Sequence, residues 1–255
     1  MRLWPWVIAF AVVASVAFLI EFYGSRLYPV ASYEGENLPL MKAGLRHRFD
    51  IYKDEKLVGH YTFWIVDVEE RDGCRVYVTR SRTSALYRGL NITIDTLYIF
   101  DEMLNPIEYR LNATLGEEHQ RILCLFNDSM VNASLWTKDQ MMRREVKLSD
   151  DTVLIDTNMA GQWELFFNSF EFTPGRRVRF SMFIPQLMEK AKIDVILDRG
   201  RESINIGGVE YSCLVARAPD LNLIFYLHEG RLLKLEQTRD NFEFIASAEA
   251  PEGEG

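Results

Sequence analysis

Apolar and polar residues alternate along most of the chain from Leu45 onward, which is the period-two pattern of strands with one buried face. In the clearest case, 107–115, one face carries Ile107, Tyr109, Leu111, Ala113 and Leu115. The same alternation is found in 91–100, 177–184 and 192–198. Further strands are predicted at 45–53, 57–69, 74–86, 119–126, 129–137, 142–148, 202–206, 209–217, 221–228, 231–238 and 241–247.

Short polar turns separate these strands, for example Lys53-Asp54-Glu55-Lys56 and Gly207-Gly208. Connections of this length suit antiparallel neighbours and leave no room for parallel crossovers. The pattern therefore predicts a mainly β fold, a long curved antiparallel sheet or half-barrel, in a single domain over residues 45–247.

One segment, 158–170, follows a helical period instead. Its large aromatic residues recur at i, i+3, i+4 and i+7, which places them on one stripe of a helix; they are Trp163, Phe166, Phe167 and Phe170. Asn158 is the expected N-cap, and Thr173-Pro174-Gly175 ends the helix. The concave face of the sheet is the natural cover for this stripe, either as an ordinary core helix or as the wall of a ligand cavity.

The N-terminus carries an uncharged stretch of eighteen residues, 3–20. As a helix it would be roughly 27 Å long, close to the ~30 Å hydrocarbon core of a bilayer. Trp4, Trp6 and Tyr23 put amphipathic rings near its ends, where membrane interfaces favour them. We predict a transmembrane anchor at 1–23, followed by a linker at 24–44. A cleaved signal, with Ser15-Val16-Ala17 as its site, and a buried core helix are the alternatives.

The basic residues near this span give a weak orientation signal, with Arg2 before it and Arg26 after it. Position as the first hydrophobic segment of a long chain favours a cytoplasmic N-terminus. We therefore expect a single-pass protein of the cell membrane, bound through residues 3–20, with its body on the extracytoplasmic side. The acidic tail, 248–255, is expected to be disordered.

Composition narrows the possible partners. Lys and Arg number 29 and Asp and Glu number 37, so the formal net charge is −8. A nucleic-acid-binding protein needs a basic footprint to neutralise phosphates, so this balance argues against nucleic acid and against docking on an anionic leaflet. The three cysteines, Cys74, Cys124 and Cys213, form no CxxC pair. Free buried thiols are expected, and one disulfide with a lone thiol is the alternative.

Residues with catalytic chemistry are sparse. The four histidines, His47, His60, His119 and His228, have no metal-binding spacing, and the sequence contains no HExxH, GxSxG or phosphate-binding glycine loop. No metal, cofactor or catalytic residue is therefore predicted. A metal or hydrolase site assembled from separate strands stays open, because spacing along the chain does not reveal it.

Four asparagines begin an N-x-S/T sequon and are candidate glycosylation sites: Asn91, Asn112, Asn127 and Asn132. Asn91, Asn112 and Asn132 fall on the face opposite the clearest apolar residues of their strands. The alternative is that polar strand faces are rich in Asn, Ser and Thr for solubility alone.

Two local motifs carry a family resemblance. The segment HRFDIYKDEKLVGHYTFWI pairs a strand, a polar turn and a glycine-containing second strand, and a later turn reads D-x-x-L-x-P at Asp101, Leu104 and Pro106. These features resemble an exported antiparallel β-sheet family of unknown function, and the whole pattern resembles the lipoprotein-carrier half-barrel proteins of bacterial envelopes. The carrier resemblance implies a sheet wrapped round an apolar cavity. The retained anchor departs from the carriers and would suit a fixed receptor.

The leading functional hypothesis is therefore a membrane-anchored, non-catalytic β domain that binds a hydrophobic or lipidic ligand or an envelope partner. Its candidate ligand-binding residues are the aromatic stripe of the helix. A structural or assembly subunit of an envelope complex is the second hypothesis, and a hydrolase with a site assembled across strands is the third.

Overall fold

The computed structural model describes residues 30–32, 38–71, 73–127, 129–149, 152–156, 159–169 and 173–247. These residues form sixteen strands, which belong to one sheet, together with a short helix α2 and a 3-10 turn η1. The N-terminal half of the sheet consists of β2 (Arg46–Lys53), β3 (Lys56–Arg71), β4 (Cys74–Tyr87), β5 (Leu90–Asp101), β6 (Pro106–Leu115), β7 (Glu118–Asn127), β8 (Met130–Trp136) and β9 (Met141–Lys147).

The C-terminal half begins after the helix. It consists of β11 (Arg177–Ile184), β12 (Glu189–Ile206), β13 (Val209–Ala218), β14 (Leu223–His228), β15 (Arg231–Gln237) and β16 (Phe242–Ala246), with η1 (Pro219–Leu221) between β13 and β14. Each half is an antiparallel meander, and the two halves are joined because β16 pairs with β2.

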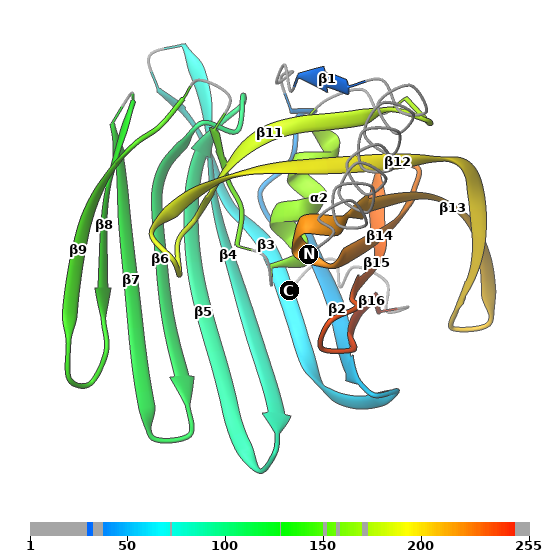
Figure 1. The fold of residues 1–255 in the computed structure, drawn as a ribbon, viewed down its shortest axis with the longest axis horizontal. Helices are drawn as coiled ribbons and strands as arrows, with labels where there is room; N and C mark the ends of the chain where they lie inside the picture. Colours follow the sequence, from blue (N-terminus) through cyan, green and yellow to red (C-terminus); the bar gives the residue numbers. More distant parts are fainter. Residues whose placement is uncertain are drawn as a thin grey trace, which may run out of the picture.

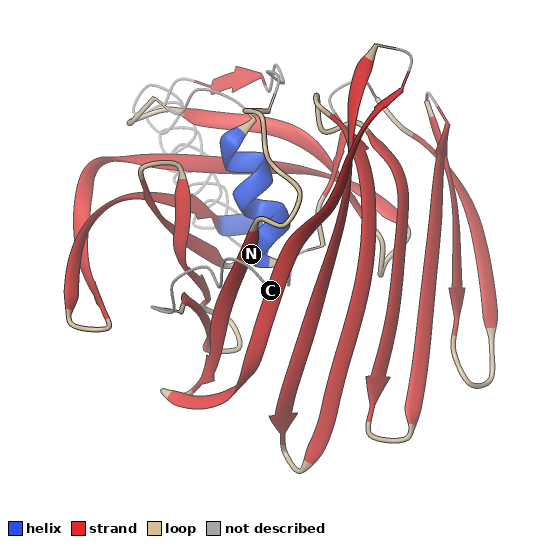
Figure 2. Ribbon diagram, turned by 180° about the vertical axis from the view of Figure 1, so that it is seen from behind, coloured by secondary structure: helices blue, strands red, loops and turns tan. Residues whose placement is uncertain are grey.

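The two halves face each other across α2 (Ala160–Asn168). The long strands of the N-terminal half lie side by side, and β11 to β13 cross over them with the helix in between (Figure 1). The view from behind shows the same enclosure of α2 (Figure 2). The sheet stays open between β9 and β11, although Arg144 of β9 forms an ion pair of 2.7 Å with Glu189 of β12.

The strands agree with the alternation pattern, since every predicted strand is present with ends shifted by a few residues. The predicted strands at 192–198 and 202–206 are parts of one long strand, β12, whose register shifts at a bulge between Leu197 and Arg201. A bulge breaks the period-two pattern without ending the strand, which explains why one strand resembled two.

The expectation that the connections leave no room for a parallel crossover was wrong at one edge of the sheet. Two short strands, β1 (Val30–Ser32) and β10 (Thr152–Leu154), pair with β11 in parallel. Helix α2 connects β10 to β11 and so supplies the crossover that a parallel pair requires. β1 lies in the interval predicted as a linker, and in that interval Leu38 is also buried and donates its amide to the Glu102 carbonyl at 2.8 Å.

Glycines explain two close approaches in the fold. A Cβ on Gly161 of α2 would lie 2.4 Å from Cγ of Phe63, so only glycine lets the helix pack this closely on β3. A Cβ on Gly59 would lie 2.3 Å from the Ser84 carbonyl oxygen on the neighbouring strand β4. Gly59 is the glycine of the strand-turn-strand motif, and the structure thus gives that motif a packing reason.

Several predictions fall outside the described residues. They include the anchor at 1–23, the tail at 248–255 and the last aromatic residue of the stripe, Phe170. The prediction of Asn158 as the N-cap was wrong, because α2 has Met159 at the cap position and no side-chain cap hydrogen bond. Within the part of the chain that the structure describes, no helix is long and apolar enough to cross a membrane.

Candidate functional site

The aromatic stripe of α2 lies inside the fold. Trp163, Phe166 and Phe167 are 0, 0 and 4 % exposed. The Trp163 ring centroid is 4.6 Å from that of Phe225, and the Phe166 ring centroid is 4.4 Å from that of Phe180. These contacts are those of a core helix, and the space where the resemblance implied an apolar cavity holds the helix and its rings. A role in ligand binding for these residues stays a prediction.

Buried polar groups hold the start of α2. The fully buried Asp156 carboxylate accepts hydrogen bonds from the Tyr109 hydroxyl at 2.7 Å and from Gln186 Nε2. The Asp156 amide donates to Gln162 Oε1 at 2.6 Å, and the Tyr61 hydroxyl accepts from the Gly161 amide at 3.2 Å. Burial, together with the Asp156 charge, raises the pKa of Tyr109 well above its ordinary value. This network positions the helix, since unpaired buried polar groups are costly.

The outer face of the N-terminal half, on the side of the sheet away from α2, carries a regular row of side chains. The strand register pairs Arg46 with Trp64, Trp64 with Arg80, Arg80 with Leu97, and Leu97 with Arg110. We call these five residues the arginine row. Its arginines lie on alternate strands, β2, β4 and β6, and are therefore spaced by about 10 Å, twice the ~4.8 Å between neighbouring strands.

The arginine row lies in a groove of about 480 Å³. The groove is basic, because four arginines and one acid line it: Arg46, Arg80, Arg82, Arg110 and Asp95. Neutral hydrogen-bonding side chains, Thr62 and Asn112 among them, and the Trp64 ring complete its walls. The outer face is thus hollowed where cationic, polar and aromatic groups converge.

Only part of this positive charge is neutralised. Arg82 forms an ion pair of 2.6 Å with Asp95, whose hydrogen bond raises the pKa of Arg82, and Arg110 pairs with Glu108. Arg46 and Arg80 have no carboxylate partner among the described residues; Arg46 instead stacks over Trp64 at 5.6 Å. Stacking holds a guanidinium in place while leaving its N–H groups free to donate.

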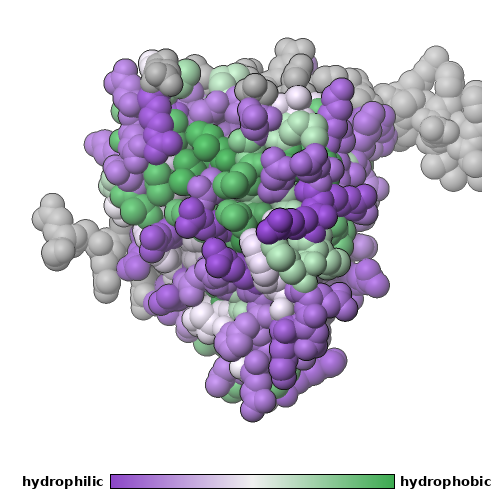
Figure 3. Space-filling view, turned by 90° about the vertical axis from the view of Figure 1, so that its left-hand side faces the viewer, coloured by the Kyte–Doolittle hydropathy of each residue, from purple (hydrophilic) through white to green (hydrophobic). Residues whose placement is uncertain are grey.

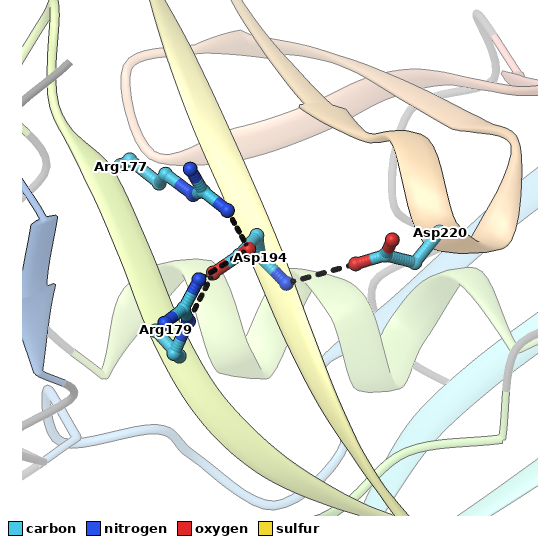
Figure 4. Close-up of polar contacts among 4 residues, drawn as sticks. All are labelled: Arg177, Arg179, Asp194 and Asp220. Atoms are coloured by element: carbon cyan, nitrogen blue, oxygen red, sulfur yellow. Dashed lines mark hydrogen bonds and ion pairs between the residues drawn. The ribbon is translucent and has the colours of Figure 1, made fainter. Parts of the chain in front are cut away.

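In the C-terminal half, by contrast, several cationic side chains form ion pairs with acids. Arg177 and Arg179 of β11 both point at Asp194 of β12, and Asp220 of η1 accepts from the Asp194 amide at 3.4 Å (Figure 4). Partial burial alone would raise the pKa of Asp194, but hydrogen bonds from Arg179 and Arg177 overcome this effect and lower the pKa to about 2. Lys234 similarly contacts Glu236 at 2.7 Å and Glu243 at 2.9 Å. These cations are held by acids of the same chain.

Among the residues that the structure describes, the histidines form no nucleophile–base pair with a serine side chain. Asp50 accepts from Ser247 Oγ at 3.1 Å and lies 2.8 Å from His60 Nδ1, so the acid stands between the other two groups. His47 Nδ1 lies 2.9 Å from Glu164 Oε1, an acid of α2. Within the described ranges no three His, Cys, Asp or Glu residues cluster as a metal site would require. A hydrolase site assembled across strands therefore gains no support from these groups.

The four sequon asparagines are all exposed, and the register places all of them on the outer face of the N-terminal half. Asn112 lines the groove, so a glycan on it would cover the arginine row. Glycosylation itself stays a prediction.

The three cysteines are free. Cys124 and Cys213 are buried as expected, and burial raises the pKa of Cys124 to about 12. Cys74 is exposed because it starts β4 beside a turn, so the expectation of burial was wrong for this thiol.

Apolar side chains gather on the side of the molecule where β9 lies. Figure 3 shows them over the upper middle of that side, with polar side chains around them. The strands at this end contribute the exposed side chains Leu125, Met141 and Met142, which are 45, 45 and 43 % exposed; Leu125 and Met141 lie on the outer face of the sheet and Met142 on the inner face. An apolar surface at an unpaired sheet end is typical of a contact site.

Comparison with known proteins gives weak similarities only. No family model and no curated protein matches the sequence. Among solved structures, the chain is similar to a β-barrel-like protein of the DUF1849 family from Brucella abortus (10% identity, 79% of this chain and 94% of that chain, TM-score 0.44). Others are a DUF1089 family protein from Pseudomonas aeruginosa (10%, 67% and 87%, 0.36) and a protein with a YmcC-like fold from Bacteroides fragilis (9%, 84% and 98%, 0.34). All three TM-scores lie below 0.5, so the function is argued from the residues of this chain.

Sequence reasoning missed the groove. A signal was present, because Arg46-His47-Arg48 and Arg80-Ser81-Arg82 each place two arginines on the same face of a predicted strand. The net charge of −8 pointed the other way, since it averages over faces that the fold separates.

Proposed function

We propose that this chain is a non-catalytic binding domain that engages an anionic component of the cell envelope through the outer face of β2 to β6. The observation that carries the proposal is the groove, in which Arg46 and Arg80 are exposed and have no carboxylate partner among the described residues. A guanidinium recognises carboxylate, sulfate or phosphate through paired N–H donors. In the C-terminal half, Arg177, Arg179 and Lys234 already pair with acids of the same chain, so these cations are not available to an anionic ligand.

The N-terminal segment of the sequence supports a location for this binding at the surface of the cell membrane. Residues 3–20 have the length and composition of a bilayer span, and we propose that they hold the domain at the extracytoplasmic side of the cell membrane. Protease added to spheroplasts should digest the body of the chain while cytoplasmic markers survive. Protection of the body under conditions that degrade known outside domains would contradict this orientation.

Cation-exchange chromatography tests the binding proposal. A protein with a net charge of −8 should flow through a sulfonate resin at neutral pH unless one face is locally basic. We expect the full chain in non-ionic detergent to be retained at low salt and released as salt rises. The double variant Arg46→Gln/Arg80→Gln should flow through.

The matched control is Arg239→Gln, which removes the same exposed group from the turn after β15, outside the groove. This variant should be retained like the parent chain. Flow-through of the parent chain, or equal retention of the double variant, would contradict an anion-binding outer face.

A second candidate function is assembly with an envelope protein through the end of the sheet at β9. The exposed Leu125, Met141 and Met142 favour it. Cross-linking in intact cells should then be reduced by Met142→Lys, whereas Leu57→Lys, a more exposed apolar position in the distant β2–β3 hairpin, should have no effect. Binding of an apolar ligand against the stripe of α2 is a third candidate, and it requires the packed rings of Trp163, Phe166 and Phe167 to move.

A further inference from the structure

We infer that the ligand of the groove is a linear acidic polysaccharide that lies across the strands along the arginine row. This inference deepens the proposed function and rests on it. It concerns the kind of anion, which follows from the spacing and the chemistry of the row.

The first argument is the repeat. Arginines on β2, β4 and β6 alternate with Trp64 and Leu97 on β3 and β5, so that a cation recurs about every 10 Å and an apolar group lies between each pair. From Arg46 to Arg110 the row covers four strand intervals, or roughly 19 Å. Arg46 and Arg80, the cations without an acid among the described residues, span half of this length, and Arg110 at the far end pairs with Glu108. A single charged headgroup would occupy only one step of this row, whereas a chain with regularly repeated anionic groups matches its length.

The second argument is the mixture of groups. A sugar ring presents hydroxyls at its edge and C–H groups on its faces. Thr62 and Asn112 offer hydrogen bonds for hydroxyls, and the half-buried Trp64 and Leu97 offer apolar contact for ring faces. The guanidiniums of Arg46 and Arg80 would take the carboxylate or sulfate groups.

The third argument separates this ligand from a nucleic acid. Single-stranded nucleic acid is held by aromatic side chains that stack successive bases within a strongly basic channel. The arginine row contains one aromatic ring, Trp64, so it offers a single stacking position and not the succession of rings that consecutive bases require. The remaining apolar position, Leu97, gives no stacking platform.

The test is isothermal titration of the full chain in non-ionic detergent with galacturonate oligomers of increasing length. Each sugar of these oligomers carries one carboxylate. We expect weak binding of the monomer and an affinity that rises with length until the oligomer spans β2 to β6, then levels off. Neutral malto-oligosaccharides of the same lengths should not bind.

Variants locate the ligand. Arg46→Gln and Arg80→Gln should each weaken binding of the longest oligomer by about tenfold, the loss expected for one charged hydrogen-bonding group. Arg239→Gln should leave the affinity within about twofold, because exposed charges at a distance are screened by salt.

Parallel titrations distinguish the possible failures. Phosphatidylglycerol nanodiscs that bind in an Arg80-dependent way while galacturonate oligomers do not would overturn the polysaccharide and leave the proposed anion-binding function intact. Tighter binding of a short oligothymidylate than of the oligomers would overturn the ligand class in favour of nucleic acid. Binding that is independent of oligomer length would overturn the row as the site. Absence of binding to every anionic probe would remove both the inference and the proposed function.

Discussion

The two sides of the N-terminal half of the sheet differ in how far their interactions are completed. On the inner side, α2 fills the space against the sheet, its aromatic rings pack on other rings and the Asp156 carboxylate accepts hydrogen bonds; Trp163 Nε1 and Gln186 Oε1 are exceptions, since they are buried without a hydrogen-bond partner among the described residues. On the outer side, the groove leaves the guanidiniums of Arg46 and Arg80 exposed and without an acid among the described residues. The inner side therefore stabilises the fold, and the outer side keeps interactions available for a ligand.

This difference changes where function is sought. The aromatic stripe was the most conspicuous feature of the sequence and was predicted to bind ligand, but its packing is that of a core. The outer arginines were inconspicuous, because charged residues on a strand face are ordinary. Unsatisfied groups in a concave site are the better indicator of binding.

The largest expected effect is on the inner side. Phe166→Ala removes a fully buried ring and should lower the free energy of unfolding by about 3 to 5 kcal/mol. Urea denaturation of the full chain in detergent measures this loss. Leu97→Ala, a half-buried apolar side chain of the groove, should cost much less. A small loss for Phe166→Ala, with altered binding of a fluorescent fatty acid, would contradict a packed inner side and would support an apolar ligand cavity there.

Gly161→Ala tests how closely the helix must approach the sheet. The added Cβ would meet the Phe63 ring at 2.4 Å, and overpacking of this kind costs about 1 to 3 kcal/mol. Gly200→Ala is the matched control, because its Cβ would meet nothing within 4 Å. Thermal unfolding midpoints of the two variants should therefore differ, and equal midpoints would show that the helix can shift without cost.

Asp194→Asn probes a site where the charges are already paired. The folded pKa of Asp194 is about 2, below its ordinary 3.8, so the ionised carboxylate stabilises the fold above about pH 4. This contribution is lost as the pH falls through the range from 3.8 to about 2. We expect the variant to lose about 1 kcal/mol at neutral pH, since its arginine partners are partly exposed, and the difference should shrink toward pH 2. A loss that does not depend on pH would assign the effect to packing.

The smallest effect on stability is expected in the groove. Arg80→Gln should change the free energy of unfolding by less than about 0.5 kcal/mol, because Arg80 has no partner acid among the described residues to lose. Arg46→Gln should cost up to about 1 kcal/mol, because it also removes the stacking of Arg46 on Trp64. The same variants should weaken anion binding. A stability loss for Arg80→Gln as large as that of Asp194→Asn would show that this arginine stabilises the fold. It would contradict the view that the outer side keeps it available for a ligand.

Local periodicity was sufficient to predict the long antiparallel strands and the helix, but not the short parallel strands β1 and β10. The segment 107–115 lies in β6 (Pro106–Leu115), and the segment 158–170 contains α2 (Ala160–Asn168). Both were predictable because the spacing of residues on one face is set by near neighbours in the sequence. The resemblance motif at Gly59 also had a local meaning, which the structure explains by the close approach of β4.

The tertiary structure alone decided which strands are neighbours and in which register. The pairing of β16 with β2, the parallel pairs of β11 and the alignment of Arg46, Arg80 and Arg110 all join residues far apart in the chain. The sequence determined which side chains share one face of each strand. The net charge of −8 is a sum over the whole chain and does not reveal that one face is basic. A shift of one residue in any strand would turn its arginine to the other face, so the groove exists only through the long-range packing that sets the register.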